Sequence, residues 1–103
     1  MNDASSSEFL GITRFRKGPN DLSRMSFLGT MKVSEEIIYF KGTESLVLEK
    51  SEINRIILEG ALFGKRFMVY RKSHYYTAII YFYSLSFARI AETFKKFSFP
   101  LEQ

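Results

Sequence analysis

The residues whose chemistry is easiest to name are basic, because lysine and arginine bind anions such as lipid headgroups or acidic peptides. They stand in two groups, one before a turn at residues 18–21 and one along the segment 65–72. A two-residue strand period puts Arg66 and Lys72 on one face and Lys65 on the other, so strand geometry alone does not gather them. The basic residues would meet only where strand ends come together at the rim of a barrel. The candidate set for a lipid or acidic ligand is Arg14, Arg16, Lys17, Lys65, Arg66 and Lys72. The alternative is that these charges only keep an exposed strand soluble.

Catalytic and metal-binding groups are scarce. The only histidine, His74, lies in a predicted turn, and a catalytic histidine needs an orienting partner and a nucleophile or substrate within reach. The only aspartates, Asp3 and Asp21, lie in a predicted tail and a loop. One histidine, no cysteine and scattered glutamates do not supply the convergent ligands of a metal site. The segment 60–64 is bracketed by glycines but lacks the Lys-Ser/Thr of a phosphate loop. We therefore expect no enzymatic activity, no metal and no cofactor.

Length and charge set the scale of the molecule. A chain of 103 residues with 46% hydrophobic and 25% charged residues is typical of one soluble globular domain. The net charge of +4 is unevenly spread, because glutamates crowd residues 35–59 and basic residues dominate after them. A molecule with one acidic and one basic side can orient at an anionic surface or meet a charged partner. A solvated surface without a partner is the alternative.

The sequence also favours a location. The absence of cysteine agrees with the cytoplasm, and residues 1–9 lack the basic and apolar regions of a signal peptide. The longest uncharged run, residues 73–88, is shorter than the about 20 residues that span a bilayer. We expect a cytoplasmic protein, and a peripheral position at a membrane stays open.

Short alternating segments separated by turn residues predict a mainly β fold. Residues 1–8 are expected to form a disordered tail, residues 9–99 a single domain and residues 100–103 a C-terminal tail. Strands are predicted at residues 9–16, 25–33, 37–41, 45–49, 53–59, 65–72 and 76–83.

One α-helix is predicted, from Ser84 to Phe97. Its apolar stripe follows helical spacing, and Ser84 or Ser86 could cap its N-terminus. A helix with such a stripe needs an apolar surface to cover, and we expect it to plug one end of a barrel made by the strands before it. The stripe consists of Phe87, Ile90, Ala91, Phe94 and Phe97.

Two segments resemble a known superfold. The hairpin pattern from Gly29 to Phe40 and the pattern from Leu48 to Ile56, with the terminal helix, are similar to the pleckstrin-homology (PH-like) superfold and its GRAM-like and bacterial PH-like branch. The resemblance implies a seven-stranded antiparallel barrel of two near-orthogonal sheets, capped by the C-terminal helix. The chain departs from the lipid-binding members, because Arg24-Met25-Ser26 lacks a second basic residue and the helix has no tryptophan.

The same resemblance implies a non-catalytic binding module. We expect a protein partner, bound at an exposed sheet edge or in the groove beside the helix. The first alternative is a peripheral membrane module that binds anionic headgroups through the basic residues named above. The second is nucleic-acid binding, because aromatic and basic residues alternate from Lys65 to Arg71, although Phe67 and Val69 share the phase of a core.

Overall fold

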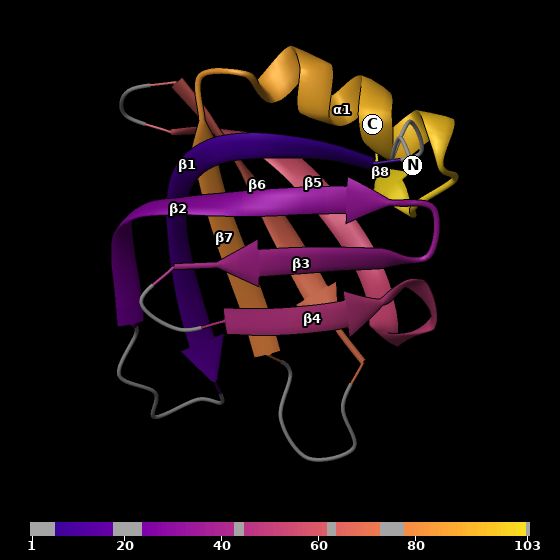
Figure 1. Ribbon diagram of the computed structural model, residues 1–103, viewed down its shortest axis with the longest axis horizontal. Coiled ribbons are helices and arrows are strands. Elements are labelled where there is room, and N and C mark those ends of the chain that lie inside the picture. Colours follow the sequence, from indigo (N-terminus) through magenta and orange to yellow (C-terminus); the bar gives the residue numbers. More distant parts are fainter. Residues whose placement is uncertain (1–5, 18–23, 43–44, 62–63, 73–77, 103) are drawn as a thin grey trace.

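The computed structural model describes residues 6–17, 24–42, 45–61, 64–72 and 78–102, and for residues 16, 17, 24–28, 61 and 78 it describes the backbone alone. The chain forms strands followed by one α-helix and a last short strand (Figure 1). The elements are β1 (Ser6–Lys17), β2 (Arg24–Ser34), β3 (Ile37–Lys41), β4 (Ser45–Glu49), the 3-10 turn η1 (Lys50–Glu52), β5 (Ile53–Ala61), β6 (Gly64–Arg71), β7 (Ala78–Ser84), α1 (Phe87–Lys96) and β8 (Leu101–Glu102).

All strands belong to one sheet with the order β4-β3-β2-β1-β7-β6-β5-β8. Neighbours are antiparallel except β5 and β8, which are parallel. The mainly β prediction is therefore confirmed. The sheet does not close, because β4 and β8 are its two edges, and the described residues form eight strands where the sequence predicted seven.

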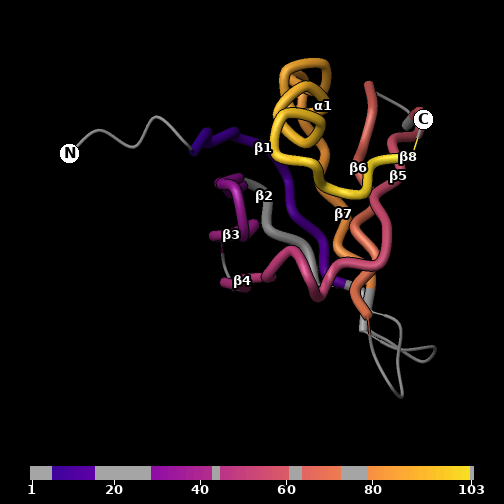
Figure 2. The backbone as a smooth tube through the Cα atoms, turned by 90° about the vertical axis from the view of Figure 1, so that its right-hand side faces the viewer, coloured from indigo at the N-terminus to yellow at the C-terminus, as the bar shows by residue number. Residues whose placement is uncertain are grey.

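The sheet is folded over, so that β2–β4 cross in front of β5–β7 (Figure 1). Figure 2 shows the two halves from the side, with β1 between them and α1 above. Strand β1 bends from one half into the other and links them, because it pairs with β2 from Ser6 to Phe15 and, on its other edge, with β7 from Ile12 to Lys17. Its register with β2 shifts between Gly11 and Thr13. At the bend a Cβ on Gly11 would lie 2.3 Å from the Tyr83 carbonyl oxygen and 2.6 Å from the Phe82 ring. Only glycine lets the two backbones approach so closely.

The core lies between the two halves, and α1 covers one end of it. Phe94 is buried, and its ring centroid lies 5.3 Å from that of Phe67 and 5.7 Å from that of Phe99. Ile90 and Phe97 are buried beside it, and Phe87 and Ala91 are partly buried against the same core. The predicted apolar stripe is confirmed. The other buried members of the core are Phe9, Phe15, Met31, Val33, Ile38, Phe40, Leu48, Ile53, Ile56, Val69, Ile80 and Phe82.

The helix begins later than predicted. Strand β7 continues to Ser84, and the Ser84 hydroxyl donates to the Leu10 carbonyl oxygen at 3.0 Å and accepts from the Ser86 N–H at 3.1 Å. Ser86 occupies the N-cap position, but its side chain makes no capping hydrogen bond. The hydroxyl predicted as a cap at position 84 instead ties the turn before the helix to β1.

Both chain ends differ from the predicted tails. Residues 6–8, assigned to a tail, belong to β1, and residues 1–5 lie outside the described residues. After α1 the chain reverses at Ser98, whose φ is +61°, and the Phe99 N–H donates to the Phe94 carbonyl oxygen at 2.9 Å. The Ile56 N–H then donates to the Pro100 carbonyl oxygen at 2.8 Å, and β8 pairs with β5. Leu101 and Glu102 of the expected C-terminal tail are therefore part of the sheet, and Gln103 lies outside the described residues.

None of the helices in the described part of the chain is both long and apolar enough to span a membrane.

Candidate functional site

The six basic residues predicted to bind a ligand do not form one patch. Lys65 is the second residue of β6, and its Nζ lies 5.0 Å from the ring centroid of Phe87 at the start of α1. Lys72 follows the opposite end of β6, about 23 Å away at 3.3 Å per residue. The backbones of Arg16 and Lys17 lie near that second end, opposite Ile79 and Ala78 of β7. The backbone positions of the six residues therefore do not converge on one rim.

Arg14 and Arg66 are the two members that the fold brings together. Their strands flank β7, and their guanidinium carbons lie 5.5 and 4.7 Å from the ring centroid of Tyr81. Register places them with Met68 on the outer face, the side of β1 and β5–β7 turned away from the core. Tyr81 is only 7% exposed and Met68 9% exposed although they lie on this face. Stacked arginines therefore cover an aromatic and apolar strip.

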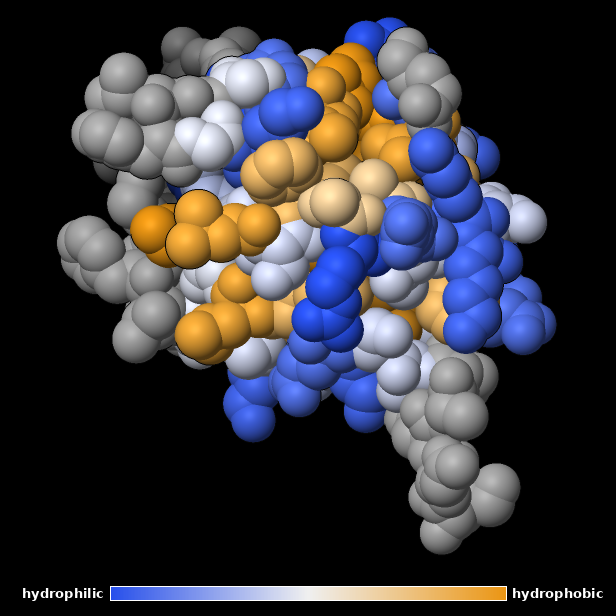
Figure 3. Space-filling model, turned by 90° about the horizontal axis from the view of Figure 1, so that it is seen from above, coloured by the Kyte–Doolittle hydropathy of each residue, from blue (hydrophilic) through white to orange (hydrophobic). Residues whose placement is uncertain are grey.

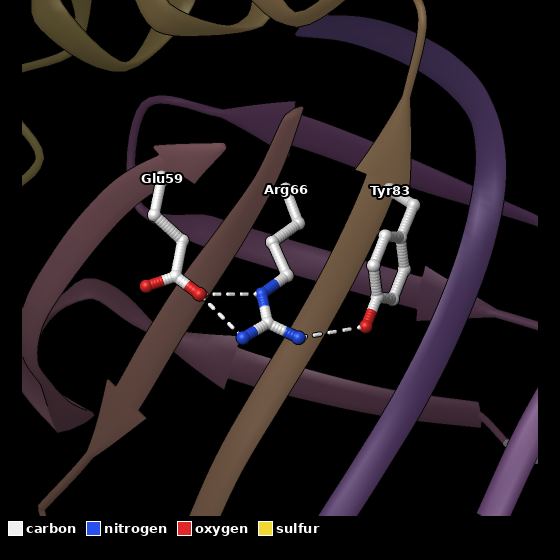
Figure 4. Close-up of polar contacts among 3 residues, drawn as sticks. All are labelled: Glu59, Arg66 and Tyr83. Atoms are coloured by element: carbon white, nitrogen blue, oxygen red, sulfur yellow. Dashed lines mark hydrogen bonds and ion pairs between the residues drawn. The ribbon is translucent and has the colours of Figure 1, made fainter. Parts of the chain in front are cut away.

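Arg66 is already engaged with a carboxylate (Figure 4). Its Nε donates to Glu59 Oε1 at 2.7 Å, its Nη2 donates to the same oxygen, and its Nη1 donates to the Tyr83 hydroxyl at 2.9 Å. These three side chains occupy one cross-strand row of β5, β6 and β7. Burial acts to lower the pKa of Arg66, but the hydrogen bonds to Tyr83 and Glu59 outweigh it, so the pKa is raised above its ordinary value. The group stays a cation, and Glu59 offsets its charge.

The acidic and basic parts of the sequence are mixed on the sheet. Pairing of β5 with β6 sets Glu59 against Arg66, and Arg71 Nη2 lies 3.5 Å from Glu52 Oε2. Arg55 Nε lies 3.6 Å from a Glu102 carboxylate oxygen. The expectation of one acidic and one basic side does not hold for these residues, because antiparallel pairing folds the glutamate-rich segment directly onto the basic one.

The groove beside the helix was one of two predicted docking places. The edge of β5 next to α1 is occupied by the chain itself, since β8 pairs with Ile56 and Ile57 and buried Phe99 packs against Phe94. The other predicted place, an exposed sheet edge, is therefore the stronger candidate.

The longer of the two edges is β4, which pairs with β3 alone among the described residues, whereas β8 has only two residues. The Lys50 N–H donates to the Glu36 carbonyl oxygen at 2.7 Å, which continues the β3–β4 ladder by one residue. In an antiparallel ladder successive residues direct their N–H and C=O groups to opposite sides. Leu46 and Leu48 therefore direct theirs toward β3, and Val47 directs its own away from it.

The two ends of β4 differ. Glu49 also turns its N–H outward, but that N–H donates to Glu52 Oε1 at 2.9 Å, so η1 closes this end of the edge. At the centre, the Val47 side chain is 50% exposed, while Leu48 next to it is fully buried. The strand alternates as the sequence predicts, but only the strand order shows that it lies at an edge.

Other exposed apolar side chains lie near the start of the helix. Leu10 is 65% exposed and Leu85 87% exposed, and the bond between the Ser84 hydroxyl and the Leu10 carbonyl oxygen holds their segments together. Seen from above, hydrophobic residues gather at the left and top of this face, and hydrophilic residues at its centre and right (Figure 3).

His74 lies outside the described residues, and within the described ones no three acidic or histidine side chains converge to hold a metal.

No protein-family model matches this chain, and no curated protein matches it, so its function is argued from the geometry of the sheet.

Proposed function

We propose that this chain is a non-catalytic, PH-like and GRAM-like binding module whose protein partner adds an extended segment to β4. A folded-over antiparallel sheet with one C-terminal helix over its core supports the relation to that superfold. The observation that carries the function is the centre of β4, where Val47 combines outward backbone groups with a half-exposed apolar side chain. A cytoplasmic location belongs to the same proposal.

An extended peptide can add to an exposed sheet edge through main-chain hydrogen bonds. A partner strand would bond to the outward groups of Ser45 and Val47 and to the carbonyl oxygen of Glu49. Each intermolecular hydrogen bond adds about 0.5–1.5 kcal/mol net, and side-chain contacts at Val47 and at Tyr39, its neighbour in β3, would supply specificity. The expected partner is a short extended peptide with an apolar residue opposite Val47.

The lipid and nucleic-acid alternatives have less support. The basic residues lie at opposite ends of β6, and Arg66 is bound to Glu59, so an anionic headgroup would meet one or two cations and not a cluster. Phe67 and Val69, the residues that interleave with the basic ones in β6, are buried in the core and offer no ring or surface for a base to stack on.

A peptide-display selection against the intact protein tests the proposal. Selected peptides should bind wild type and Val47→Thr with affinities within about threefold, because threonine keeps the N–H and the β-branched shape. Val47→Pro removes the outward N–H, and proline is tolerated on an edge strand, so we expect the fold to survive and binding to fall at least tenfold. Circular dichroism verifies the fold. Peptides that bind Val47→Pro as well as wild type would show that another surface is used.

A further inference from the structure

We infer that the segment added to β4 is β4 of a second copy of this chain. This inference rests on the proposed function and names its partner. It starts from the strand sequence Ser-Leu-Val-Leu-Glu, which is complementary to itself when two copies run antiparallel with a two-fold axis at Val47.

The backbone groups match in this register. Val47 faces Val47 of the second copy, and because both turn their N–H and C=O groups outward, they can form a reciprocal pair of hydrogen bonds. Ser45 faces Glu49, so each Ser45 N–H can donate to the Glu49 carbonyl oxygen opposite. The bond from the Glu49 N–H to Glu52 stays intact, because the pairing does not need that N–H.

The side chains match as well. Val47 covers Val47, and Leu46 stands opposite Leu48 on the core side of the sheet. No two like charges face each other, since the single charged residue of the strand, Glu49, meets Ser45. Two common protections against pairing with a copy are absent from this strand, because β4 contains neither lysine nor proline.

The position of the axis follows from the length of the strand. If the two-fold axis lay at Leu46 or at Leu48, part of β4 would face residues of the second copy that lie outside its β4. With the axis at Leu48, those residues would belong to η1. The axis at Val47 pairs the whole of Ser45–Glu49 with itself. A contact between two such short strands buries less area than a stable dimer needs, which predicts a weak and reversible dimer.

Single-cysteine variants test the register, because the chain has no cysteine of its own. Two Val47→Cys residues would face each other at about 5.5 Å between Cα atoms, within the range of a disulfide. In Ser45→Cys, the cysteine and its copy would be four positions apart along the strands, about 13 Å, which is too far. We expect Val47→Cys to form a disulfide-linked dimer under mild oxidation at least tenfold faster than Ser45→Cys at equal concentration.

Sedimentation equilibrium supplies the second measurement. Wild type should gain weight-average mass as its concentration approaches 1 mM, and Val47→Pro should remain a monomer with unchanged circular dichroism. Equal crosslinking rates for the two cysteine variants, or a wild-type monomer throughout, would overturn the second copy as partner. Display peptides that still discriminate wild type from Val47→Pro would then leave the proposed function standing with a different strand as its ligand.

Discussion

Replacing Gly11 by alanine tests the close packing of β1 on β7. The new Cβ would lie 2.3 Å from the Tyr83 carbonyl oxygen and 2.6 Å from the Phe82 ring. Tyr83 belongs to the β1–β7 ladder and Phe82 is fully buried, so neither can move without disturbing the sheet or the core. Overpacking of this kind costs about 1–3 kcal/mol, and a backbone clash places Gly11→Ala at or above the upper end of that range. The lower chain entropy of unfolded alanine returns about 0.5–1 kcal/mol, which leaves a net loss of about 2–3 kcal/mol.

Gly60→Ala is the matched control, because Gly60 lies in β5 and a Cβ there would meet nothing within 4 Å. Alanine at this position should leave stability unchanged or raise it by about 0.5–1 kcal/mol. Urea unfolding followed by circular dichroism measures both. With an m-value of about 2 kcal/mol per molar, the midpoint should fall by about 1–1.5 M in Gly11→Ala and stay or rise in Gly60→Ala. If the two variants unfold at the same urea concentration, the close approach of β1 and β7 at Gly11 is not present in solution.

Three further predictions follow from the core and the charged residues. Phe94→Asp should abolish cooperative thermal unfolding, because the carboxylate would replace a buried ring, whereas Ala88→Asp on the exposed side of the helix should fold normally. A double-mutant cycle of Arg66→Met and Glu59→Gln should give a coupling energy of about 0.5–1 kcal/mol in urea unfolding. The coupling energy should be smaller at high salt, because both side chains are partly exposed. A coupling energy of zero would show that the pair contributes nothing to stability. Co-sedimentation with anionic liposomes should change less than twofold in Lys65→Glu, and strong binding that this charge reversal removes would restore the lipid alternative.

The sequence predicted the elements better than the way they pair. Helical spacing alone placed Ile90 and Phe94 on the buried stripe, and strand alternation placed Phe67 and Val69 in the core. Strand β8 could not be predicted, because two residues have no detectable period. Leu101 and Glu102 form a strand only because the chain reversal at Ser98 carries them to β5.

The candidate site shows the same limit. Alternation placed Arg66 and Lys72 in one phase, but the partner of Arg66 depends on how β5 and β6 align. The sequence suggested a loop across residues 60–64, whereas the strands continue to Ala61 and resume at Gly64, and this pairing sets Glu59 opposite Arg66. An edge strand has no signature in its own residues either, because Val47 lies at an edge only through the order of the other strands.

The central place of β1 has a consequence for the order in which the molecule is made. Strands β1 to β4 are neighbours both in sequence and in the sheet, so each of their hairpins closes a short loop. The other edge of β1, from Ile12 to Lys17, waits for β7, which follows about 70 residues later, and closing such a loop costs about 1.7 kcal/mol more than closing one of 10 residues. During synthesis β1 can therefore pair on one edge only until most of the chain has been made. The pairing of Ile12 with Tyr83 then joins strands that are far apart in the sequence, and non-local pairing of this kind slows folding.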